Sequence, residues 1–114
     1  MGMHNPQGST ILEHALEVAA LCRPLIAAIQ RRDRDLASQV RRAVSSIALN
    51  SAEALGNRSG NRRLRAESAL GSLYEARAGI QLAIAWGYFA EAVAAEALRS
   101  LNRLGGRIYG VVRR

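Results

Sequence analysis

The chain has 114 residues, of which 49% are hydrophobic and only 4% aromatic, and it carries a net charge of +7. This length allows one domain with a modest aliphatic core, and the scarcity of β-branched and aromatic runs indicates an all-helical protein. The longest uncharged run, residues 78–90, is shorter than the roughly 20 residues of a membrane span, and the N-terminus lacks a signal pattern, so we expect a cytoplasmic protein without membrane contact.

The positive charge is carried by one residue type, because all sixteen basic residues are arginine. Arginine suits bidentate contacts with phosphate, so the charge indicates a surface for a polyanion such as RNA or DNA. A GC-rich genome would explain the missing lysine. It would not explain the excess of positive over negative charge.

The predicted domain begins after a short lead-in. Residues 1–8 are expected to be disordered, and residues 9–114 to form one bundle of four helices. The first helix opens near Ser9 or Thr10, because Thr10 and Glu13 have the spacing of a capping box. Apolar residues then recur every three or four positions, as an amphipathic helix requires.

Three residues within this first helix carry separate predictions. Pro24 lacks a backbone N–H and should kink the helix or divide it. Cys22 is the only cysteine and lies in an apolar run, which indicates a buried structural thiol. His14 is expected to be a partly exposed helical residue.

Two polar breaks delimit the second helix. Asp33 or Asp35 can accept hydrogen bonds at its start. The turn formers of residues 56–61 end it, and within them Ser59 or Asn61 can cap the third helix.

Gly87 ends the third helix, and Tyr88 should pack over the turn that follows. The fourth helix is predicted over residues 90–112. Leu64 in the third helix and Val93 in the fourth are assigned to the apolar core stripes.

Four helices with short loops imply an up-down-up-down antiparallel bundle. The first and third connections then lie at one end of the bundle and the second at the other. The alanine-rich segment 90–97 would allow close approach of a neighbouring subunit. Alanine is also simply a good helix former, so this segment has a purely local explanation too.

Arginines are predicted to gather at both ends of this bundle, where they could bind backbone phosphates without reading sequence. Surface ion pairs with nearby carboxylates would absorb part of that charge. The candidate nucleic-acid-binding residues are Arg31, Arg32, Arg58, Arg62, Arg63 and Arg65.

Two carboxylates on neighbouring helices, Glu53 and Glu75, have two interpretations: an acid/base or metal site, or a buried polar network that fixes helix register. We favour the network. A di-iron site would need two Glu-x-x-His motifs, and no serine or cysteine has a plausible histidine base, so we expect no enzyme, metal or cofactor. The residues of the predicted network are Arg42, Asn50, Glu53, Ser72 and Glu75.

Ordered motifs in the middle of the chain carry a family resemblance. They are QVRRA (39–43), S-I-x-x-N-x-A-E (46–53), G-x-R-S (56–59), ALGSLYE (69–75) and GY (87–88). In these the chain resembles the bacterial four helix bundle protein family, which includes proteins encoded by intervening sequences in 23S ribosomal RNA genes. A related branch is the accessory variability determinant of diversity-generating retroelements. The chain is more similar to the intervening-sequence branch.

The resemblance implies a left-handed four-helix bundle that assembles as a homopentameric barrel. In the retroelement branch such a barrel binds nucleic acid and a reverse transcriptase. The chain departs from the family where Ala48 replaces a frequent proline and Ala54 a frequent glycine, which makes the second helix more regular.

Together these features predict a homo-oligomeric, non-enzymatic protein that binds nucleic acid through backbone phosphates as an accessory factor. The alternative is a structural adaptor that binds a protein partner, such as a reverse transcriptase, and has little affinity for nucleic acid.

Overall fold

The computed structural model describes residues 9–56 and 61–114. The expectations for residues 1–8, Arg58 and Ser59 lie outside this described part. The helices of the described part are α1 (Ile11–Gln30), α2 (Arg34–Gly56), α3 (Asn61–Ala85) and α4 (Glu91–Val112).

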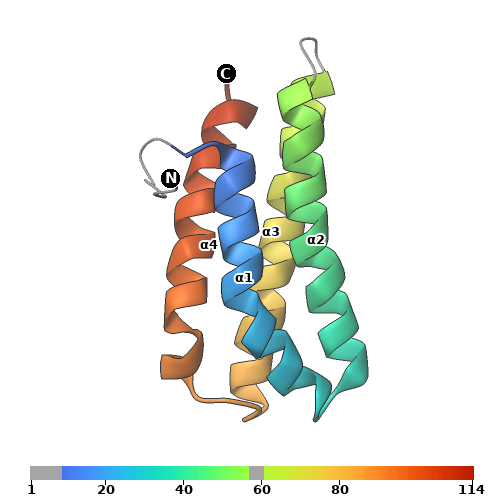
Figure 1. Cartoon of the computed structure of the whole chain (residues 1–114), viewed down its shortest axis with the longest axis vertical. Coiled ribbons are helices and arrows are strands. Elements are labelled where there is room, and N and C mark those ends of the chain that lie inside the picture. The colour runs from blue at the N-terminus through green and yellow to red at the C-terminus, as the bar shows by residue number, and fades with distance from the viewer. Residues whose placement is uncertain (1–8, 57–60) are drawn as a thin grey trace.

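The four helices alternate in direction and close into a ring in which α4 packs against α1 (Figure 1). The α1–α2 and α3–α4 connections lie together at the lower end in Figure 1, and the start of α1 and the end of α4 lie at the upper end. The predicted antiparallel four-helix bundle is confirmed.

The start of α1 has the predicted capping box. The Thr10 hydroxyl accepts a hydrogen bond from the Glu13 N–H at 2.9 Å, and the Glu13 carboxylate accepts one from the Thr10 N–H at 2.8 Å. The helix then runs unbroken through Pro24, so of the two predicted outcomes, a kink or a division, the division does not occur. Both Pro24 and Ala20, whose carbonyl loses its partner, are exposed, and water can therefore take the place of the missing N–H.

Local contacts join the two connections at the lower end. Asp33 is the cap of α2, because one of its carboxylate oxygens accepts a hydrogen bond from the Leu36 N–H at 3.0 Å. The other oxygen accepts one from the Tyr88 hydroxyl, also at 3.0 Å. Gly87 has a φ of 80°, and the N–H groups of Gly87 and Tyr88 donate to the carbonyls of Ile84 and Ala83. This pair of bonds ends α3 at the predicted glycine.

The core is aliphatic, but two predicted members are outside it. Leu64 is 56% exposed and Val93 is 61% exposed. In α4 the buried face runs through Ala94 and Ala97, one step away from Val93, because Ala94 and the larger buried residues keep a spacing of three and four. The largest fully buried side chains are Leu25, Ile29, Ile47, Leu73, Ile80, Leu101, Leu104 and Ile108.

Helices α2 and α3 approach each other closely. A Cβ atom added at Gly79 would lie only 2.6 Å from a methyl group of Val40. Seven residues earlier on α3, the Ser72 hydroxyl donates a hydrogen bond to the Ser46 hydroxyl at 2.7 Å. These contacts define the antiparallel register of α3 against α2.

A buried histidine joins α1 to α4. His14 is only 5% exposed, so the expectation of a partly exposed residue is wrong. Its Nδ1 lies 3.1 Å from Arg107, which can only donate, so the ring proton is on Nε2 and points to Ser100 at 3.2 Å. Arg107 also donates to the Ser9 carbonyl at 2.6 Å. A neutral imidazole therefore links both helices.

The free energy of unfolding is expected to decrease as the pH falls below about 6.5, where the unfolded histidine takes up its proton. Burial, and next the charge of Arg107, lower the pKa of folded His14, whereas Glu17 opposes this. Folded protein therefore binds fewer protons than unfolded protein in this window, and stability rises with pH. Urea denaturation between pH 5 and 7 measures the slope, at most about 1.4 kcal/mol per pH unit for one proton.

His14→Gln should flatten this slope, with replacement of His4, the other histidine of the chain, as the control. A slope that survives in His14→Gln and disappears in the His4 variant would contradict the assignment.

Candidate nucleic-acid interface

The arginines predicted at the upper end are already engaged. Arg63 lies 3.7 Å from Glu67 on the same helix, and Arg65 lies 2.9 Å from Glu53 on α2. These pairs are exposed and contribute little to stability, but each carboxylate cancels a positive charge locally. The predicted phosphate contact at Arg58 falls outside the described residues.

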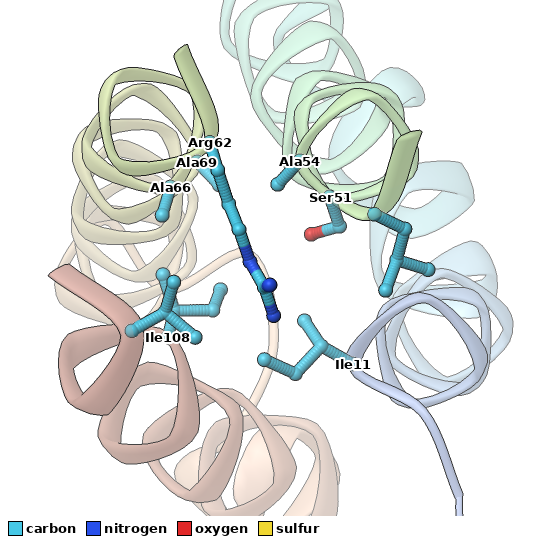
Figure 2. A pocket seen from close by; sticks show the side chains of 9 residues that line it. Ile11, Ser51, Ala54, Arg62, Ala66, Ala69 and Ile108 are labelled. Atoms are coloured by element: carbon cyan, nitrogen blue, oxygen red, sulfur yellow. The ribbon is translucent and has the colours of Figure 1, made fainter. Parts of the chain in front are cut away.

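Arg62 lies over a small apolar pocket at the same end (Figure 2). The pocket has a volume of about 30 Å³, and Figure 2 shows the Arg62 side chain reaching from α3 across it toward Ile11. The Arg62 side chain therefore partly covers the apolar lining, as long basic side chains often do. The pocket is lined by Ile11, Ser51, Ala54, Leu55, Arg62, Ala66, Ala69, Ile108 and Val111.

A larger group of arginines lies over the lower half of α1 and α2. Arg41 borders three adjoining surface hollows: one along the first connection, one between α1 and α2, and one on the outer side of α2. All members of this group are exposed, and none of their guanidinium groups forms an ion pair or hydrogen bond with the residues that the structure describes. We call this group the Arg41 surface; it consists of Arg23, Arg31, Arg34, Arg41 and Arg42.

Sequence reasoning placed Arg31 and Arg32 at this end but missed most of the Arg41 surface. Arg32 lies with its guanidinium 5.4 Å from the centre of the Tyr88 ring. A usable signal was present, because Arg41 and Arg42 have no acidic residue three or four positions away on their helix. No carboxylate on the same helix offsets the charge of such arginines, so this charge remains available at the surface.

The predicted internal network is much smaller than expected. The Asn50 amide donates to the carbonyl and hydroxyl of Ser46, both at 3.0 Å, and Ser46 also accepts the bond from Ser72. Ser46 itself was missed, although it lies one helical turn before Asn50.

Arg42, Glu53 and Glu75 do not belong to this network, because all three are exposed. The close approach of α2 and α3 leaves room for serine hydroxyls and an amide but not for charged side chains, which point outward to water. The prediction of a buried network is therefore wrong for these three residues.

The other candidate chemical groups are dispersed. Burial raises the pKa of the Cys22 thiol to about 11, so Cys22 is a protonated core residue near neutral pH. Within residues 9–56 and 61–114, no three histidine, cysteine or acidic side chains lie close enough to hold a metal ion. In the same ranges no helix is both long and apolar enough to cross a membrane.

Comparisons with known proteins agree with the fold. The family described as 23S rRNA-intervening sequence protein matches residues 9–110. A solved protein of unknown function from the S23 ribosomal protein family of Bacteroides thetaiotaomicron is similar with a TM-score of 0.83 and 17% identity, over 92% of this chain and 100% of that chain. At this identity the likeness shows the fold alone. No curated protein matches the chain.

Proposed function

The chain belongs to the 23S rRNA-intervening sequence protein family, and we propose that it is a non-enzymatic accessory protein that binds nucleic acid through backbone phosphates. The Arg41 surface is the observation that carries the proposal. We assign the protein to the cytoplasm, where RNA and DNA are both accessible.

The charge of the Arg41 surface suits a phosphate backbone. Each guanidinium offers planar donors that match phosphate oxygens, and these arginines need not break an ion pair before binding. Asp33 and Asp35 lie beside Arg31 and Arg34, and the hydrogen bonds that Asp33 accepts from Leu36 and Tyr88 do not remove its negative charge. The five arginines of the surface outnumber these two aspartates, and the remaining positive charge attracts a polyanion.

We expect labelled RNA and DNA oligonucleotides to bind at about 50 mM salt and to dissociate steeply toward about 200 mM, because phosphate contacts release counterions. Fluorescence anisotropy at a series of salt concentrations measures the slope of log K against log salt. If neither RNA nor DNA binds at about 50 mM salt, the proposal is rejected.

We also propose that the chain assembles as a homo-oligomer, with the homopentamer as the stoichiometry that the resemblance implies. Large apolar side chains remain on the surface of the single chain, which supports burial against another copy. Light scattering with and without RNA measures the stoichiometry. The exposed residues that we assign to this contact are Leu16, Leu49, Leu55, Leu64, Tyr74, Val93 and Tyr109.

An adaptor for an acidic protein partner is the second candidate. The hollow between α1 and α2 has an apolar floor that includes Ile26 and Val44, with Arg23 and Arg41 beside it. This combination suits an amphipathic acidic helix. A stable oligomer that copurifies with an acidic protein and fails to bind nucleic acid at about 50 mM salt would favour this candidate over the first.

A further inference from the structure

An exposed tryptophan stands at the lower end of the bundle. Trp86, the only tryptophan of the chain, is 63% exposed although it directly follows the end of α3. Its neighbour Tyr88 is half-buried and engaged with Asp33. An indole ring that is left in water at a fixed position is a candidate contact surface.

The register of the helices places Trp86 beside the α1–α2 connection. On α3, Ser72 meets Ser46 of α2, and the position of Gly79, seven residues later, meets Val40. Seven residues is close to two helical turns, so Trp86 continues the same side of α3. Antiparallel continuation along α2 then brings Trp86 level with the first residues of α2 and the connection before it.

The connection that the helix register places level with Trp86 carries arginines. Arg31 and Arg34 are exposed members of the Arg41 surface, and Arg32 covers the Tyr88 ring. Across the described residues, no arginine is stacked on the Trp86 ring itself. An open aromatic face therefore lies beside cations on a connection that is held in place by Asp33.

We propose that this end of the bundle binds single-stranded nucleic acid, with one base stacked on Trp86 and the adjoining phosphates held by Arg31 and Arg34. Aromatic platforms beside a basic groove select single strands, because every base has a face to stack and in a duplex those faces are already covered. The inference rests on the proposed function and narrows its ligand to the single-stranded form.

Because Trp86 is the only tryptophan, its fluorescence reports directly on the site. We expect a single-stranded oligonucleotide to quench this fluorescence, and a duplex of the same sequence or an abasic strand of the same length to quench it far less. Trp86→Ala should weaken single-strand binding by about five- to a hundredfold, the range for loss of one stacked base. Duplex binding should remain unchanged.

Leu82→Ala is the matched control, because Leu82 lies one helical turn earlier on α3 and is also exposed. It should leave both affinities unchanged. If single strands bind equally well to Trp86→Ala and the wild type, the stacking inference is overturned while the proposed function stands. If no nucleic acid binds, both are overturned. If light scattering finds that Trp86→Ala dissociates an oligomer, a second copy covers the ring and the stacking site is excluded.

Discussion

Replacing Arg23, Arg41 and Arg42 together with glutamine is expected to lower nucleic-acid affinity roughly thousandfold at about 50 mM salt. Each phosphate contact contributes about 0.7 to 0.9 to the slope of log K against log salt, so loss of three contacts should reduce the slope by about two to three. If the variant and the wild type bind equally near about 1 M salt, a slope difference of this size amounts to a roughly thousandfold difference in affinity at about 50 mM salt. Anisotropy titrations at several salt concentrations give both quantities.

The matched control removes the same charge from arginines that already have partners. Arg63, Arg65 and Arg77 contact Glu67, Glu53 and Asn102 respectively. Replacing these three with glutamine should change the slope much less, because their charge is partly cancelled or their donors are occupied. The opposite result, a large effect of the control and a small effect at the Arg41 surface, would move the interface to α3.

Features that depend on neighbours in the sequence were predictable. The Thr10–Glu13 capping box, the cap by Asp33 and the helix end at Gly87 each involve groups only a few residues apart. The groups that form these hydrogen bonds are fixed by spacing along the chain, so the helix ends could be predicted within a residue or two. Short connections between helices of similar length then left one reasonable topology.

Features that depend on how helices face each other were not predictable. Residues 92–97 of α4 are almost all small and apolar, so their pattern does not show which face of the helix is buried. The prediction therefore placed Val93 in the core in place of Ala94. The charge left on an arginine likewise depends on other helices. Glu53 was expected inside the bundle, but it reaches across the surface to Arg65 and offsets the charge of that arginine.

Leu73→Ala should destabilise the protein by about 2 to 5 kcal/mol. Leu73 is fully buried near the middle of α3, so truncation removes apolar contacts and leaves a cavity that rigid helices fill only in part. For a domain whose total stability is about 5 to 15 kcal/mol, this is a large fraction. Urea denaturation at a fixed protein concentration measures the change, since assembly would make stability depend on concentration.

Gly105 of α4 lies next to Leu73 and permits a sharper test of the packing between α3 and α4. A Cβ atom at Gly105 would lie 3.3 Å from a methyl group of Leu73, which is tight, whereas a Cβ at Gly106 would have no neighbour within 4 Å. Both alanine substitutions gain about 1 kcal/mol of helix propensity. Only Gly105→Ala should gain more in the Leu73→Ala background than in the wild type, because its methyl group enters the space that Leu73 vacates. Equal gains for both glycines in both backgrounds would mean that α4 shifts to close the cavity, and that the α3–α4 contact is less rigid than the fully buried leucine implies.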